Sequence, residues 1–269
     1  MRVPALTIRP LALGLALAAA AFAVQAQEKV VFATNWKAQA GHGGFYQALG
    51  DGTYKKYGLD VEIQQGGPMV NNRPMLPAGK VDFLMTGNLL QSFDNVKNGV
   101  PTVVVAAFFQ KDPQAMFAHP GQGFDTFKDM TKAPVAFIGK DGQFSFWQWM
   151  KSEYGFKDSQ LKPYTFNVGP FLADKKSIQQ GYAISEPLSI KAKAGFDPVV
   201  QLLADNGFST YADTIRTRAG LEARVKDFYD KMVKAGLYKP GEVDLSKVVT
   251  TQFVNKGVGV DVRKKLTGK

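Results

Sequence analysis

Residues 135–155 read VAFIGKDGQFSFWQWMKSEYG and contain one complete strand, loop and helix. The apolar run 135–138 predicts a β-strand, and the polar, glycine-containing stretch that follows it predicts a loop. Residues 144–154 have helical spacing, and Gly155 is a natural helix terminator. A strand followed by a helix in this way is the building unit of α/β folds.

The same alternation continues along the chain in both directions. It predicts an α/β fold with largely parallel sheets, in which the apolar run 102–109 is a long strand buried on both faces. The helix at 71–78 is expected to be short or distorted, because it contains Pro74 and Pro77. The other expected strands are 29–33, 59–63, 81–85, 163–166, 182–184 and 199–203, and the other expected helices are 44–57, 89–97, 127–130, 172–179, 188–194 and 222–234.

Two places are suited to a crossing between lobes, since each follows a predicted buried strand and turns polar. They are the Asp112-Pro113 turn and the segment 207–214. We therefore predict a first lobe made of residues 28–112 and 215–269, a second lobe of residues 113–206, and a crossing segment at 207–214.

The N-terminal residues 1–26 have the pattern of a cleavable secretory signal peptide. Arg2 and Arg9 precede an apolar run of about 14 residues, shorter than the roughly 20 that span a bilayer, and Val24 and Ala26 are spaced for cleavage. We expect a periplasmic protein without stable membrane insertion. The chain has no cysteine, which excludes disulfides, thiolate metal sites and a lipid-modified N-terminal cysteine.

The formal net charge is +10, but the lysines stand singly or in pairs along the chain. They form no long basic run and no interleaved aromatic pattern typical of nucleic-acid modules. We therefore expect solvated charged faces and no nucleic-acid partner.

The ends of the predicted strands carry the candidate binding residues, because ligands of parallel α/β sheets bind where strands lead into helix N-termini. These positions offer amides, aromatic faces and glycines that allow close backbone approach, which suit a small, flat, hydrogen-bonding molecule. They do not assemble a nucleophile with a base, a metal-ligand set or a cofactor fingerprint, so we predict no catalytic residue, metal or cofactor. The positions are Thr34, Asn35, Trp36, Thr86, Gly87, Asn88, Gly139, Gly142, Gln143, Phe144, Ser185 and Glu186.

Several longer stretches together resemble a known family. The chain is similar to the solute-binding proteins of nitrate, sulfonate and taurine-type ABC importers, and most similar to the branch related to fungal thiamine-pyrimidine synthase, which includes binders of formylaminopyrimidine. The stretches are NWKAQAGHGGFYQALGDGTYKKYGLDVEIQQGGP, AGKVDFLMTGN, NGVPTVVVAAFFQKDPQAMFAH, PYTFN, PFLADKKSIQQGYAISEP and KDFYDKMVKAGLYKPGEVDLSKVVTTQFVNK.

The resemblance implies a periplasmic-binding-protein-like fold, in which two α/β lobes close on a ligand in the cleft between them. It implies that Asn35, Trp36 and His42 line this cleft from the first lobe, with Gly87 and Asn88 nearby, and that Glu186 of the SEP motif lines it from the second. A structural role for His42 stays open beside the cleft role, whereas we expect His119, Trp147 and Trp149 to be structural.

The function implied is capture of a small polar heteroaromatic, such as a pyrimidine thiamine precursor, by a monomer that delivers it to an ABC permease with its ATPase. Two alternatives share the resemblance: a sulfonate, nitrate or taurine binder, and a synthase-like enzyme. The synthases use a histidine, a lysine-bound pyridoxal phosphate, iron and a cysteine-rich motif, and the last is missing here.

A third alternative follows from the segment IRTRAGL at 215–221, which leads almost directly to the last helix where family members usually carry several more helices. The C-terminal part is therefore expected to be shortened, and a shortened relative without a transport role is an open alternative.

Overall fold

The computed structural model describes residues 27–214 and 218–250. The predicted signal peptide at 1–26 lies outside the described residues, as do residues 215–217 of the segment expected to be shortened. Within the described ranges, no helix is both long and apolar enough to cross a bilayer. The same ranges contain no group of three or more His, Asp or Glu side chains that could hold a metal ion.

The chain divides into two compact units. The first comprises Met1–Val31 and Ala38–Ile63, and the second comprises Phe32–Lys37 and Gln64–Lys269. Among its described residues, the first unit contains one 3-10 turn and two short helices. Strands β1 and β2 begin in this unit and end in the second. The bounds are β1 (Glu28–Ala33), η1 (Ala40–His42), α2 (Gly43–Gly50), α3 (Thr53–Lys56) and β2 (Leu59–Gln64). The predicted lobes, with boundaries at 112 and 207, stay a prediction.

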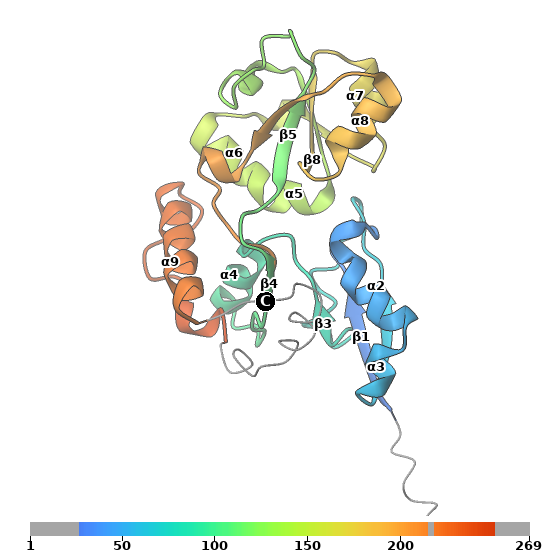
Figure 1. Ribbon diagram of the computed structural model, residues 1–269. Helices are drawn as coiled ribbons and strands as arrows, with labels where there is room; N and C mark the ends of the chain where they lie inside the picture. The colour runs from blue at the N-terminus through green and yellow to red at the C-terminus, as the bar shows by residue number, and fades with distance from the viewer. Residues whose placement is uncertain (1–26, 215–217, 251–269) are drawn as a thin grey trace, which may run out of the picture. The chain divides into compact units, whose positions relative to one another are not determined.

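Strands β3 and β4 of the second unit each belong to a small sheet (Figure 1). Strand β3 (Phe83–Leu84) pairs in parallel with the end of β1, in a sheet of order β2-β1-β3. Helix α4 (Leu90–Lys97) follows it. Strand β4 (Ala107–Phe109) pairs in antiparallel with β10 (Ala212–Thr214). The two paired strands are about a hundred residues apart in the sequence, so they are not joined by a hairpin turn.

The largest sheet has five strands in the order β7-β6-β8-β5-β9. Strand β6 pairs in parallel with β7 and β8, whereas β5 is antiparallel to β8 and β9. The α/β fold class is therefore confirmed, but this sheet is mixed and not largely parallel. The bounds are β5 (Gln114–Ala118), β6 (Val135–Ile138), β7 (Leu161–Pro163), β8 (Ser177–Tyr182) and β9 (Val199–Leu202).

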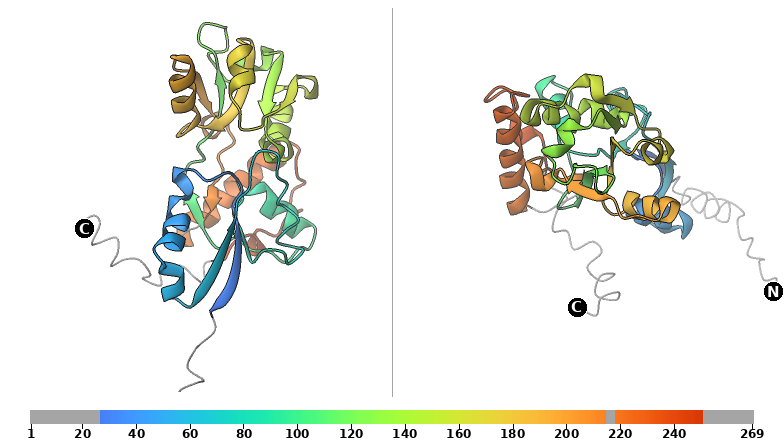
Figure 2. Two further views of the ribbon diagram at one scale, coloured as in Figure 1. Left: turned by 90° about the vertical axis from the view of Figure 1, so that its right-hand side faces the viewer. Right: turned by 90° about the horizontal axis from the view of Figure 1, so that it is seen from above.

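Helices cover both faces of this sheet (Figure 2). Side chains of α6 join a large apolar cluster on one face, and side chains of α7 and α8 join a smaller one on the other. The helices of this part are α5 (Lys140–Phe144), α6 (Phe146–Tyr154), α7 (Gly169–Ala173), α8 (Glu186–Ala194) and α9 (Arg218–Lys234), with 3-10 turns η2 (Asp129–Lys132), η3 (Asp158–Gln160), η4 (Ala204–Asn206) and η5 (Leu245–Lys247).

The large cluster contains the residues expected to be core. Trp147 and Trp149 are buried, and the predicted amphipathic helix is present as α9, with Phe228 and Met232 fully buried. The Phe228 ring lies 5.8 Å from that of Phe93 on α4, measured between centroids. Burial of each such side chain contributes about 1.5–3 kcal/mol, so α9 is held mainly by its apolar face.

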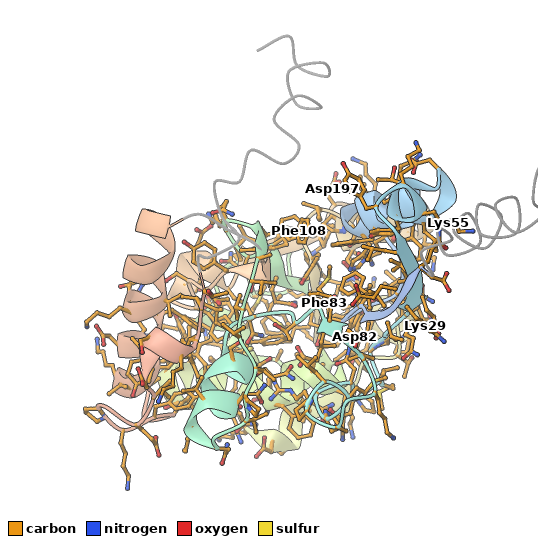
Figure 3. All side chains as sticks on the ribbon, turned by 90° about the horizontal axis from the view of Figure 1, so that it is seen from below. Lys29, Lys55, Asp82, Phe83, Phe108 and Asp197 are labelled. Carbon is orange, nitrogen blue, oxygen red and sulfur yellow. The ribbon has the colours of Figure 1, made fainter. Side chains whose placement is uncertain are left out.

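Two predictions in the region 71–109 are wrong. Residues 73–79 form successive turns and no helix is present at 71–78, because the two prolines remove backbone donors and clash with a preceding helical turn. The predicted strand 102–109 is reduced to β4 and one bridge, Val104 with Val249. The segment is not buried on both faces, since the Phe108 side chain is 45% exposed. Phe83 on strand β3 is also exposed, at 50%; Figure 3 labels both residues.

Three further predictions fail around β8 and α5. The helix expected at 172–179 is instead α7, which ends at Ala173. The strand expected at 182–184 is instead β8, which begins earlier, at Ser177. The polar sequence SIQQGY lacks the alternation of a half-buried strand because it is covered on both faces. The helix expected at 144–154 is divided at Ser145, whose backbone is not helical, into α5 and α6.

Candidate functional site

Trp36 and Tyr164 form an aromatic pair in the second unit. Their ring centroids are 6.1 Å apart with an interplanar angle of 24°, and the edge of Phe166 meets Trp36 at 6.0 Å. A methyl group on Gly139 would lie 3.4 Å from Cη2 of Trp36, so glycine at the end of β6 gives the indole room. The pair therefore joins the loop after β1 to the segment that follows β7.

The loop that carries Trp36 is fixed by Thr34, which is fully buried. Its hydroxyl donates to the Trp36 carbonyl oxygen at 2.8 Å and accepts from the Gly66 amide at 3.2 Å. The side-chain amide of Asn72 donates to the Thr34 carbonyl oxygen at 2.9 Å. These local bonds satisfy backbone groups that leave the sheet here, and they orient the indole.

Phe166 has a left-handed backbone conformation, with φ of 65°. This conformation is uncommon for a residue with a side chain. The Lys37 ammonium lies 5.1 Å from the centroid of its ring, in cation–π geometry. The strained residue is thus part of the same aromatic group as Trp36, and such strain is often found where a ligand binds.

Glu186 is the first residue of α8 and is buried. Its Oε2 accepts from the Tyr182 backbone amide at 2.7 Å and from the Ser185 hydroxyl, and its Oε1 lies 3.5 Å from the Tyr164 hydroxyl. Burial raises the pKa of the Glu186 carboxyl above its usual value, while these hydrogen bonds act in the opposite direction. A carboxylate of this kind is suited to an amino group or a protonated ring nitrogen.

Asn35, Gly87 and Asp141 lie close together. A methyl group on Gly87 would lie 3.7 Å from Nδ2 of Asn35 and 3.1 Å from Oδ2 of Asp141. The Arg73 guanidinium pairs with Asp141 at 3.3 Å and with Asp94 at 3.6 Å. It also lies over Phe144, 5.8 Å from the ring centroid. The polar part of the site is therefore built around a charged group that the sequence had not indicated.

The other candidates from the predicted loops have local roles. Oδ1 of the buried Asn88 accepts from the Leu90 amide at 3.0 Å at the start of α4. The Gln143 side chain donates to the Ile138 carbonyl oxygen at 3.0 Å. Phe144 is 48% exposed and lies under the Lys140 ammonium at 5.2 Å. Of these, Phe144 presents the most accessible surface.

His42 belongs to the first unit and is 3% exposed. Its Nδ1 accepts from the Gln39 amide at 3.2 Å in the turn η1. Burial lowers the pKa of the imidazole, so the neutral form is favoured at neutral pH. A structural role is therefore present, and the predicted cleft role stays a prediction.

His119 is buried between the rings of Phe171 and Phe196, at centroid distances of 4.5 and 4.8 Å. Its Nε2 lies 2.8 Å from the Phe171 carbonyl oxygen. Because a carbonyl oxygen can only accept, this nitrogen carries the hydrogen. His119 therefore has the structural environment expected from the sequence.

Sequence reasoning did not single out Tyr164, Phe166, Arg73 or Asp141. Tyr164 and Phe166 stand in PYTFN, at the end of a predicted strand, which is the same signal that selected Trp36. Arg73 and Asp141 are ordinary charged residues in sequence, and only their contacts in the folded chain distinguish them.

Comparisons with known proteins agree with the sequence resemblance. The family model described as NMT1/THI5 like matches residues 39–237. A 4-amino-5-hydroxymethyl-2-methylpyrimidine phosphate synthase of Schizosaccharomyces pombe is 23% identical over 115 residues, which are 43% of this chain and 33% of the synthase. The matched region thus spans a third of that relative's length.

Two solved structures are among those that match this chain. A protein from Bordetella bronchiseptica RB50 matches with a TM-score of 0.57 and 12% identity, over 88% of this chain and 98% of that one. The periplasmic aliphatic sulphonate binding protein SsuA from Escherichia coli matches with a TM-score of 0.49 and 14% identity, over 78% and 71% of the two chains. The match to the family model covers well over half of the residues, and the chain therefore belongs to the NMT1/THI5-like family.

Proposed function

We propose that this protein is the periplasmic solute-binding component of an ABC importer and captures a small polar heteroaromatic compound, such as a pyrimidine precursor of thiamine. The observation that carries the proposal is the placement of the stacked Trp36 and Tyr164 rings beside the buried Glu186 carboxylate. A planar nitrogen heterocycle needs both an aromatic face and a hydrogen-bond acceptor of this kind.

Trp36 and Tyr164 are stacked on each other, with ring centroids 6.1 Å apart. Two rings that sandwich a third have faces about 7 Å apart, twice a contact distance of about 3.5 Å. In this proposal a ligand ring that enters between Trp36 and Tyr164 separates them, and its interaction with both favours a closed, ligand-bound form.

In this proposal the protein binds and releases its ligand without changing it, acts as a monomer, and passes the ligand to a permease with its ATPase. The signal-like segment at 1–26 supports export to the periplasm. The family supports the pyrimidine, since its curated relative is named a pyrimidine phosphate synthase.

A sulfonate or another small anion is a second candidate. Lys37 and Lys140 lie over the partly exposed rings of Phe166 and Phe144, at 5.1 and 5.2 Å. Neither lysine takes part in an ion pair among the described residues. Both are therefore available to an anionic ligand.

The test is a calorimetric and thermal-unfolding screen of the purified protein with aminopyrimidines, aliphatic sulfonates, taurine and nitrate. A ligand at a hundred times its Kd stabilises the folded form by about 2.7 kcal/mol, which raises Tm by roughly 5–10 °C for a chain of this size. Stabilisation by aminopyrimidines supports the first proposal. Stabilisation by the anions alone would favour the second candidate.

A further inference from the structure

Gln179 lies in the middle of β8 and is fully buried. Neither its amide oxygen nor its amide nitrogen has a hydrogen-bond partner within the part of the chain that the structure describes. Buried polar side chains are paired in the great majority of cases, with protein groups or with ordered water. An unpaired amide at the centre of a sheet therefore indicates a missing partner.

The neighbours of Gln179 across the sheet cannot supply this partner. Its paired residues are Phe117 on β5 and Phe137 on β6. Directly paired residues on adjacent strands project on the same face, so the amide lies between two aromatic side chains. These rings offer neither a carbonyl nor a carboxylate.

Along β8, the next residue on the same face is Gly181. Alternate residues of a strand are roughly 6–7 Å apart. Glu186 occupies the space of the side chain that Gly181 lacks, because a methyl group there would lie 2.5 Å from Cγ and 2.6 Å from Cδ of Glu186. The Glu186 carboxylate and the Gln179 amide are therefore neighbours on one face of the sheet.

The carboxylate has capacity to accept further hydrogen bonds. Its Oε2 receives two bonds, the Glu186 backbone amide also bonds to the carboxyl group, and Oε1 has a long 3.5 Å contact with the Tyr164 hydroxyl. A carboxylate has about four acceptor positions. One water molecule with two bonds of about 2.8 Å joins polar atoms that are about 5 Å apart. This is somewhat less than the roughly 6–7 Å between alternate residues of a strand, so the two side chains have to lean toward each other to share a water.

We propose that Gln179 and Glu186 hold one buried water molecule between them. The water accepts a hydrogen bond from Nε2 of Gln179 and donates one to Oε1 of Glu186. Buried waters typically satisfy polar groups that the protein leaves unpaired. Gln179 is then a positioning residue that orients the Glu186 carboxylate through this water. That this carboxylate contacts a ligand rests on the proposed function.

Ser177 lies on the same face, on the other side of Gln179, and is the obvious competitor for the water. Its hydroxyl already donates to the Asp174 carbonyl oxygen at 2.6 Å. A neutral, paired hydroxyl gains less from a water than a buried carboxylate does. This difference places the water on the Glu186 side.

The experiment combines a high-resolution crystal structure of the unaltered protein with two double-mutant cycles, and neither part requires a ligand. The crystal structure should contain a water within about 2.7–3.2 Å of both side chains. Gln179→Met should lower the urea midpoint, and the losses of Gln179→Met and Glu186→Gln should not be additive. Ser177→Ala and Glu186→Gln form the control cycle, for which additive losses are expected.

Three results would overturn the proposal. One is a direct bond between the Gln179 amide and Glu186 in the crystal structure, and another is a higher urea midpoint for Gln179→Met. The third is additivity of Gln179→Met with Glu186→Gln. If no ligand is found for the protein, the proposed function fails, but the crystallographic water and the first cycle still decide this inference.

Discussion

The indole of Trp36 stacks on the ring of Tyr164, with centroids 6.1 Å apart. This contact joins the loop that follows β1 to the residue that follows β7, so an aromatic group forms from two parts of the chain that are distant in sequence. The Tyr164 hydroxyl lies 3.5 Å from Oε1 of the buried Glu186. Aromatic stacking and polar recognition are therefore adjacent in this site.

We expect Trp36→Ala to abolish the rise in Tm that the ligand produces. The substitution removes the face on which a heteroaromatic ring stacks, and such pairs contribute about 0.5–1.5 kcal/mol beyond area burial. Trp36→Phe is the matched control, because it keeps a smaller aromatic face and should retain part of the shift. An unchanged calorimetric Kd for Trp36→Ala would place the ligand elsewhere.

The pH dependence of stability should report the buried carboxyl of Glu186. Its pKa is raised above the usual value of 4.5 by burial, so the folded protein holds a proton that the unfolded chain releases. The contribution of Glu186 is therefore fully present below the unfolded pKa and is lost as pH rises through the folded pKa.

Above about pH 4.5 the unfolding free energy of the unaltered protein should therefore decrease as the pH rises, and Glu186→Gln should remove part of this decrease. Urea titration at several pH values measures it. The glutamine keeps an oxygen that can accept from the Tyr182 amide. Identical pH profiles for the two proteins would show that the Glu186 pKa is the same in the folded and unfolded states.

Gly181→Ala should destabilise the protein by about 1–3 kcal/mol, since the new methyl group overpacks a filled site. It would lie 2.5 Å from Cγ of Glu186 and 2.7 Å from Cε2 of Phe117. Gly44→Ala in α2 is the control, because no atom lies within 4 Å of the added methyl group. There alanine should be neutral or stabilising by up to about 1 kcal/mol. Equal urea midpoints for both variants would contradict the packing around Gly181.

We expect His119→Leu to lower the unfolding free energy by about 1–3 kcal/mol, because the Phe171 carbonyl oxygen loses its buried donor. His119→Gln should recover part of this loss, as its amide can donate to the same oxygen. Urea unfolding of the three proteins measures the difference. If leucine is tolerated as well as histidine, the bond between His119 and Phe171 is without effect on stability.

The sequence predicted the elements whose local pattern is strong. The apolar face of α9 and the buried Trp147 and Trp149 followed from helical spacing, and β6 followed from a short apolar run before a glycine. It failed for β8, which is buried on both faces and carries the polar Gln179 and Gln180 there. Gln180 is tolerated because its Oε1 accepts from the Gly139 amide after β6, and no local pattern contains that information.

The candidate site shows the same division. The strand-end rule selected Trp36 and Glu186, which the structure places on either side of Tyr164. It also selected Asn88 and Gln143, whose polar groups bond to nearby backbone. The rule identifies residues at the correct edge of a sheet, but the direction of a side chain depends on the helix or loop that packs against it.

The amino-acid sequence by itself determined the α/β class, the family and the aromatic and amide residues available for binding, because periodicity and residue type are local properties. Tertiary structure alone decided that β5 runs antiparallel to β8, that Arg73 meets Asp141, and that the carboxylate of Glu186 fills the space beside Gly181. Each of these depends on packing between segments that are distant along the chain. Burial then raises the pKa of Glu186, a property that the residue acquires only when the surrounding elements exclude water from it.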